Sequence, residues 1–152
     1  MITLFYRNFT YLISRKPNAN YNAKSSNSYF RSNREINDNF FLQKFHGFDI
    51  PKWAKQYMNE MKEVSEFMFK SNTLTSELKR LRGGPLIKKI TTHMERKVAK
   101  ETNKKMFLYA GHDSNIANLL NSVGAFNYLP PPYASTVIVE LHEVDSSFNV
   151  QV

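Results

Sequence analysis

Apolar side chains recur every three or four positions between residues 52 and 70, which predicts an amphipathic helix. The apolar positions are Trp53, Tyr57, Met61, Val64 and Phe67 or Met68. Lysine, glutamate and asparagine occupy the positions on the other side. Because a stripe of this kind is typical of a helix that packs on a core, we interpret this helix as scaffold.

A second amphipathic segment follows a double glycine. Gly83 and Gly84 interrupt the periodicity, and proline suits the first turn of a helix, so a helix is predicted over 85–99. Its apolar positions are Leu86, Ile87, Ile90, Met94 and Val98. His93 lies at the edge of this stripe, and we interpret it as an ordinary, partly buried histidine.

Short apolar runs replace the helical period in the last third of the chain. Residues 106–110 predict a buried strand, and a helix that ends near Gly124 follows it. Residues 136–141 are rich in β-branched side chains and predict a second strand. A turn at 145–147 then leads to a partner strand over 148–152. Strand, helix and hairpin in this order predict the edge of an α/β sheet.

The first 44 residues keep no period of two or 3.6, and Asn, Ser, Arg and Tyr are frequent in them. Such a composition buries too little apolar surface to offset the entropy of ordering, so residues 1–44 are predicted to form an irregular or disordered leader. Arg7 interrupts the apolar opening, and we recognise no convincing signal peptide. A basic organellar transit peptide is the alternative. No apolar run is long enough for a membrane span.

Composition and charge narrow the candidate chemistry. The 152 residues include no cysteine, which excludes a disulfide, a thiolate metal site and a cysteine nucleophile. The formal charge is +8, but Glu is interleaved with Lys on the predicted helices, which favours a solvated surface. Nucleic acid is therefore not expected as a partner. The alternative is a non-catalytic basic binding module that binds an anionic partner through Lys88, Lys89, Arg96, Lys97 and Lys100.

One pair of residues carries candidate catalytic chemistry. His112 and Asp113 follow a predicted strand and precede a helix, at the sheet edge where α/β folds bind ligands. A histidine there can donate a hydrogen bond to a phosphoryl oxygen, and an aspartate can hold a proton for a leaving group. The alternative is purely structural, with Asp113 or Ser114 as the helix cap and His112 as a loop residue.

Four short motifs follow one another along the chain: IPKWA at 50–54, LRGGPL at 81–86, FLYAGHDS at 107–114 and LPPPYAS at 129–135. In this order and rough spacing they resemble the C-terminal region of the histidine acid phosphatases of the prostatic and insect venom type. The resemblance covers about residues 45–152. It implies the C-terminal part of a histidine phosphatase-like, three-layer α/β/α fold.

The resemblance also implies an activity, namely two-step hydrolysis of phosphate monoesters through a phosphohistidine, with no metal ion or other cofactor. The family's nucleophile lies in an Arg-His-Gly-x-Arg-x-Pro motif, whose arginines bind the phosphate. Carried over to this sequence, His112 contacts the phosphoryl oxygens and Asp113 protonates the leaving alcohol. The family further implies a secreted or lysosomal protein and allows a homodimer.

The sequence departs from the family pattern at the nucleophile. Arg-His-Gly does not occur, and the His46-Gly47 pair lacks both arginines. The family's usual cysteine after the LPPPYAS motif is replaced by Thr136. We therefore predict that residues 45–152 are a partial domain without the half that bears the nucleophile. Phosphate monoesters would be substrates only if that half were supplied.

Charge leads to the same expectation. A phosphate dianion leaves water only when several fixed cations or donors replace its hydration. Residues 106–152 contain no lysine or arginine, and Arg80 and Arg82 are expected on the outside of their segment. We predict that the chain alone is inactive. A secreted phosphatase-like protein that binds a partner is the alternative.

Overall fold

The structure is a computed structural model that describes residues 2–6 and 26–152, with side chains from residue 35 onward. The described residues divide into two compact units, one formed by 2–6 with 72–152 and the other by 26–71. Residues 1 and 7–25 of the predicted leader, and with them most of the segment on which a signal or transit peptide was considered, lie outside the described residues.

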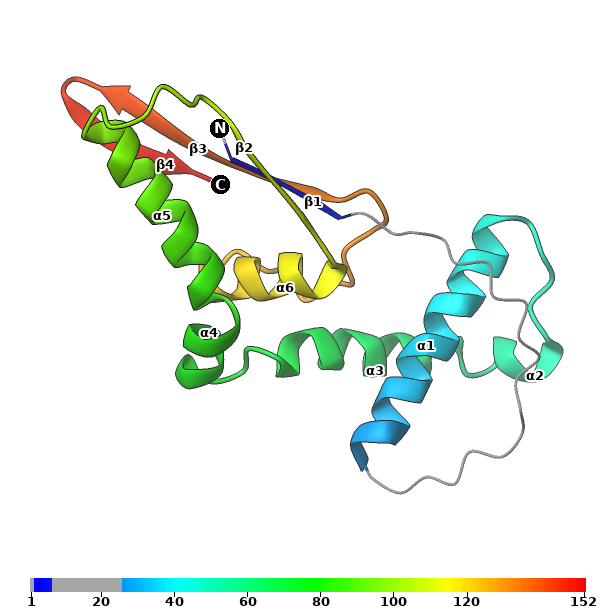
Figure 1. The fold of residues 1–152 in the computed structure, drawn as a ribbon. Coiled ribbons are helices and arrows are strands. Elements are labelled where there is room, and N and C mark those ends of the chain that lie inside the picture. The colour runs from blue at the N-terminus through cyan, green and yellow to red at the C-terminus, as the bar shows by residue number, and fades with distance from the viewer. Residues whose placement is uncertain (1, 7–25) are drawn as a thin grey trace. The chain divides into compact units, whose positions relative to one another are not determined.

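The first unit is built on a sheet with the strand order β2-β1-β3-β4 (Figure 1). The strands are β1 (Ile2–Tyr6), β2 (Phe107–Gly111), β3 (Thr136–Val144) and β4 (Ser147–Gln151). β1 pairs in parallel with β2 and antiparallel with β3, and β3 forms an antiparallel hairpin with β4. The predicted α/β class is confirmed, as are the two predicted strands and the hairpin.

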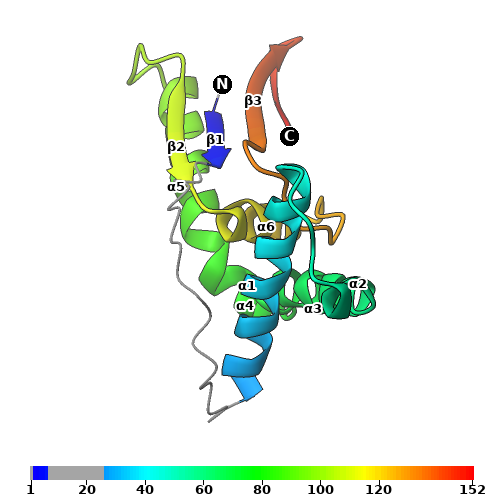
Figure 2. The same cartoon turned by 90° about the vertical axis from the view of Figure 1, so that its right-hand side faces the viewer.

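Helices α5 (Gly84–Val98) and α6 (Asp113–Ser122) pack on one face of this sheet (Figures 1 and 2). The short helix α4 (Ser76–Arg82) precedes α5. The buried core between helices and sheet consists of Ile90, Met94, Ile116, Leu119, Val137 and Val139. Leu108 and Ile138 lie at the alternate positions of their strands, on the other face of the sheet, and are exposed. The predicted helix over 85–99 is confirmed within one residue at each end.

The prediction of an irregular leader is wrong for the strand β1 and for the helix α1 (Ser26–Phe45). A five-residue strand is too short to show a period, and β1 forms because β2 and β3 satisfy its backbone groups. Phe40 of α1 is buried together with Ala54 and Met61 of the same unit. Tertiary packing therefore stabilises a helix whose own amphipathic pattern is weak.

The second unit corrects the prediction of one helix over 52–70. Two helices are present, α2 (Lys52–Lys55) and α3 (Met58–Ser71). Because the chain breaks at 56–57, the apolar positions of the two helices do not form one continuous helix face. Trp53 and Tyr57 are therefore exposed. The buried side chains of α3 are instead Met61, Ser65 and Phe69.

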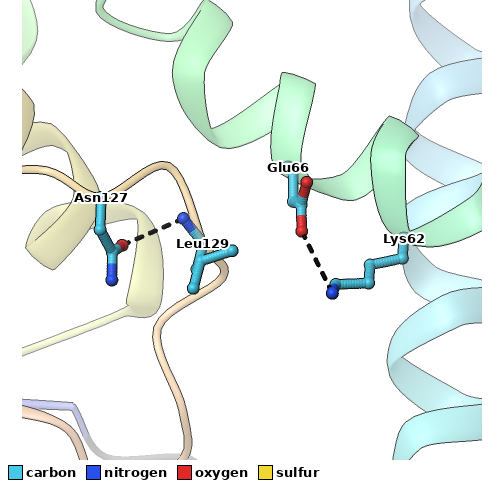
Figure 3. A network of polar contacts seen from close by, with 4 residues as sticks. All are labelled: Lys62, Glu66, Asn127 and Leu129. Carbon is cyan, nitrogen blue, oxygen red and sulfur yellow. Dashed lines mark hydrogen bonds and ion pairs between the residues drawn. The ribbon is translucent and has the colours of Figure 1, made fainter.

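A surface ion pair lies on the solvated side of α3. Lys62 Nζ and Glu66 Oε1 are 3.7 Å apart, one helical turn from each other (Figure 3). Exposed i,i+4 pairs of this kind contribute roughly 0.3–0.5 kcal/mol. The pair therefore adds little to the stability of α3.

A lysine in the left-handed region ends α5. Lys100 has φ 57°, and beyond it the Glu101 N–H donates to the Arg96 carbonyl at 2.9 Å. This position normally favours glycine, because a Cβ raises the energy of left-handed backbone by about 1 kcal/mol. We expect Lys100→Gly to raise the free energy of unfolding by about 0.5–1 kcal/mol in urea denaturation. The control is Lys88→Gly, inside the helix, which should lower the free energy of unfolding by about 1 kcal/mol because glycine disfavours helix interiors. A loss of stability in Lys100→Gly would contradict the expectation.

Candidate functional site

The His112-Asp113 pair lies where the carboxyl end of β2 meets the start of α6. β2 ends at Gly111, and His112 keeps an extended backbone (φ −95°, ψ 167°) as the N-cap of the helix. Asp113 is the first helical residue. The structural alternative, in which Asp113 or Ser114 caps the helix, is therefore wrong in detail, because the cap position belongs to His112.

Local hydrogen bonds hold both residues in place. The His112 N–H donates to Asn115 Oδ1 at 2.8 Å, and the Ser114 N–H donates to Asp113 Oδ1 at 2.6 Å. The His112 side chain is exposed and Asp113 is half-buried. The imidazole is thus accessible to a ligand, while the carboxylate is oriented at a helix start, where the exposed N–H groups favour negative charge.

Asn115 is a positioning residue that sequence reasoning missed. Its side chain lies over Gly111, where an added Cβ would be 3.2 Å from both Cβ and Oδ1 of the asparagine. Glycine at 111 therefore lets the asparagine reach back to the N–H of His112. The available signal was a polar residue three positions after the cap, which is the spacing of a capping box.

Two further segments reach the same sheet edge as His112. In the backbone register, Tyr6 at the end of β1 lies opposite Gly111, and Phe5 lies opposite Thr136 at the start of β3. The end of β1 therefore lies beside the end of β2, and the start of β3 lies on the other side of β1 (Figure 2). In the loop that precedes β3 the Leu129 N–H donates to Asn127 Oδ1 at 3.0 Å (Figure 3). Sequence reasoning missed β1 as a neighbour of the site.

An apolar cavity of about 290 Å³ lies under the loop that precedes β3. Ile116 and Leu120 of α6 line one side, and the prolines at 130–132 line another. None of the described residues that line this cavity is charged. The cavity can therefore accept an apolar group, but it lacks the cations that a phosphate dianion needs.

The arginines considered for phosphate binding lie far from His112 along the helix. α4 carries Arg80 and Arg82 and packs at the far end of α6, where Ser122 Oγ donates to the Lys79 carbonyl at 3.3 Å. The 10 residues of α6 span roughly 15 Å, so this end lies about that distance from the His112 end. The structure thus does not bring these arginines to the pair. His46 lies just after α1 in the other compact unit.

In the part of the chain that the structure describes, no group of three or more His, Asp or Glu side chains could hold a metal ion. Within the same residues, no helix is long and apolar enough to cross a membrane.

A sequence profile of the histidine phosphatase superfamily (branch 2) matches residues 9–152, and the chain belongs to this family. The resemblance inferred from the four motifs is thereby confirmed. The match begins well before residue 45, so it also includes part of the predicted leader.

Among individual proteins, the chain is similar to acid phosphatases. It is 31% identical to the prostatic acid phosphatase of Bos taurus over 121 residues, which cover 77% of this chain and 31% of the relative. It is 31% identical to the venom acid phosphatase Acph-1 of Apis mellifera over 111 residues, 70% of this chain and 29% of the relative. The lysosomal acid phosphatase of Bos taurus is 29% identical over 121 residues. The chain thus spans somewhat under a third of the length of these relatives.

Proposed function

We propose that residues 45–152 supply the leaving-group side of an acid phosphatase site, which hydrolyses phosphate monoesters through a phosphohistidine. His112 would donate a hydrogen bond to a phosphoryl oxygen, and Asp113 would protonate the departing alcohol. The observation that carries the proposal is the position of this pair, which lies at the β2 edge and at the start of α6 in a chain of this family. The attacking histidine and the phosphate-binding arginines would come from outside the 152 residues.

The proposed chemistry needs two steps that share one proton. In the first step a histidine nitrogen forms a bond to phosphorus, the ester P–O bond breaks, and the carboxyl of Asp113 gives its proton to the leaving oxygen. In the second step the Asp113 carboxylate takes a proton from water as that water attacks phosphorus and the P–N bond breaks. Phosphate leaves, and the histidine and Asp113 return to their first state.

Charge supports the proposal that the chain alone is inactive. Phosphoryl transfer is catalysed mainly by positioning and by stabilising charge, and one arginine can contribute about 10³-fold or more. The segment 106–152 contains no lysine or arginine, and the arginines of α4 lie at the other end of α6. A phosphate bound only by His112 and the helix start would therefore remain largely uncompensated.

The names of the relatives support a secreted or lysosomal location for this chain, because the relatives are named as prostatic, venom and lysosomal acid phosphatases. A homodimer is proposed on the same family basis. Neither nucleic acid nor a metal cofactor is part of the proposal.

The alternative of a basic binding module on α5 finds less support. Arg96 forms an ion pair with Glu101 at 3.4 Å, and Lys89 lies 5.4 Å from the centre of the Tyr109 ring. These two cations therefore make contacts within their own unit. A phosphatase-like protein that only binds a partner would retain the fold without needing His112.

The proposal can be tested with p-nitrophenyl phosphate as substrate. The 152-residue chain alone should hydrolyse it at the rate of buffer. We would also make a chimera of bovine prostatic acid phosphatase in which residues 45–152 of this chain replace the corresponding C-terminal segment. This chimera should hydrolyse the substrate. In that chimera His112→Ala should lower kcat by about 10²- to 10³-fold, as loss of one oxyanion donor does elsewhere.

The matched control is His142→Ala, which removes an exposed histidine of β3 that pairs with Glu140 at 3.3 Å. It should leave kcat within about twofold of the parent chimera, as is usual for a surface substitution away from a site. Turnover by the pure chain would contradict the proposed inactivity. A folded chimera that is inactive, or one that His112→Ala does not affect, would contradict the proposed site.

A further inference from the structure

The apolar cavity under the loop that precedes β3 begins one helical turn from Asp113. Ile116 and Leu120, which line the cavity, follow Asp113 by three and seven positions on α6. Residues at these spacings lie on one face of a helix, and their side chains lean toward the N-terminus of that helix. The cavity therefore lies along the same face of α6 as the proposed general acid, and it begins roughly 5 Å further along the helix axis.

The sheet places another part of the cavity at the edge that carries His112. Ser135 and Thr136 line the cavity where the loop enters β3. In the register of the sheet Thr136 lies opposite Phe5, and Phe5 lies opposite Ala110, two residues before His112. Two strand spacings amount to about 10 Å. This distance is comparable to the length of a small aromatic phosphate ester.

The cavity extends from the core of its unit to the surface, and its loop wall is held in place. Among the residues that line it, Ile116 is 2% exposed and Leu129 is 48% exposed. The prolines at 130–132 fix their own φ angles, and Ser135 Oγ donates to the Pro132 carbonyl at 2.5 Å. A wall of this kind loses little conformational entropy when a ligand binds.

The lining favours an apolar ligand group over a charged or hydroxylated one. None of the described residues that line the cavity is charged. The three polar side chains of the lining, Asn127, Ser135 and Thr136, each take part in a hydrogen bond within the loop. A hydroxylated group would lose water there without regaining equivalent hydrogen bonds, whereas an apolar group gains by leaving water. The volume of about 290 Å³ suits one aromatic ring or a short branched alkyl group.

We propose that this cavity holds the apolar group of the leaving alcohol, so that phosphate monoesters of aryl-substituted or branched alcohols are preferred to those of sugars and polyols. The inference rests on the proposed function of His112 and Asp113 and adds the substrate class. In this arrangement the phosphoryl group lies at His112 and the leaving oxygen at Asp113. The carbon skeleton lies against Ile116 and Leu120, which come next along the same helix.

The first measurement follows binding to the 152-residue chain and needs no catalysis. Benzyl alcohol, added in an NMR titration, should shift the methyl signals of Ile116 and Leu120 to saturation, whereas glycerol should not shift them. Leu120→Trp fills part of the cavity. It should raise the dissociation constant of benzyl alcohol by at least about tenfold, since the burial of an aromatic ring is worth at least that factor.

The matched control is Ile87→Trp, because Ile87 and Leu120 are both half-buried and pack on the same core, but Ile87 does not line the cavity. It should change the dissociation constant by less than about twofold, as expected for a site without a shared contact. Leu129→Asn is a second variant, at an exposed position. The amide at the rim should raise the dissociation constant by about threefold or more. Leu74→Asn, at a similarly exposed leucine outside the cavity, should not.

The second measurement compares kcat/KM of the active chimera for benzyl phosphate and glycerol 2-phosphate. Both esters release an alkyl alcohol that needs a proton, so the difference between them reports mainly on how the carbon skeleton is bound. Benzyl phosphate should be preferred by at least about tenfold. Leu120→Trp should lower this preference by about the same factor, and Ile87→Trp should keep it.

The proposal is overturned if benzyl alcohol does not saturate the signals, if Leu120→Trp and Ile87→Trp raise the dissociation constant equally, or if the preference of the chimera survives Leu120→Trp. In each of these cases an active chimera that depends on His112 would leave the proposed function standing. An inactive chimera contradicts the proposed function itself, and the leaving-group role of the cavity with it.

Discussion

Asp113→Asn in the active chimera is expected to slow the hydrolysis of an alkyl phosphate by about 10³-fold, within the range that general acids contribute. Hydrolysis of p-nitrophenyl phosphate should fall by less than about tenfold in the same variant. The difference follows from the leaving group, because nitrophenolate departs without a proton and an alkoxide does not. Asparagine keeps the shape of the side chain and its acceptor oxygen, but it has no acidic proton.

The measurement is kcat for both substrates at one pH, under conditions where the chemical step limits turnover. Asp145→Asn is the control, since Asp145 is exposed in the β3–β4 turn and its φ of 50° suits asparagine. Neither rate should change in the control. An equal loss for both substrates would show that Asp113 acts on the phosphoryl group or on the fold, and would contradict its role as the general acid.

Gly83→Ala is expected to lower the free energy of unfolding by about 2–3 kcal/mol, at the upper end of the cost of overpacking. Gly83 lies at the junction of α4 and α5, against α6. An added Cβ would be 2.7 Å from Ser122 Cβ and 2.9 Å from the backbone oxygen of Asn118, and it would overlap Ser122 Oγ. The backbone of Gly83 has φ −93°, which alanine adopts readily. The expected loss is therefore due to packing alone.

The neighbouring glycine provides the matched control. A Cβ on Gly84 would meet only Arg80 Cγ, at 3.9 Å, so Gly84→Ala should leave stability unchanged or raise it by up to about 1 kcal/mol. Urea denaturation of the two variants measures the difference. Equal effects of the two substitutions would contradict the close approach of α6 to Gly83. The result would also test whether the Ser122 end of α6 packs against Gly83.

The elements that could be predicted from the sequence are those whose pattern lies within their own residues. α5 has four turns of apolar periodicity between a glycine pair and a basic last turn, and the structure places it within one residue of the predicted range. β3 and its hairpin likewise follow from a β-branched run and a polar turn. In both cases local propensity and tertiary packing favour the same conformation.

The candidate pair could be predicted because strand, glycine, histidine and aspartate are consecutive in the chain. The strand and the side chain that hold this pair in place could not be predicted as readily. The strand β1 pairs with residues more than 100 positions away, and only that pairing places its end at the edge beside His112. Asn115 could have been recognised from its spacing, but its packing over Gly111 depends on how β2 turns into α6.

By itself the sequence determined the helical and strand segments with clear periods, the order of the motifs and the choice of His112 and Asp113 as candidate site residues, because each of these is a property of neighbouring residues. Only the tertiary structure decided that Gly83 rather than Gly84 must lack a side chain, that Trp53 is exposed, and that α6, the prolines at 130–132 and the start of β3 line one cavity. Contacts of this kind join segments far apart in the chain. They leave no local period, since they arise when helices and strands bury their apolar faces against one another.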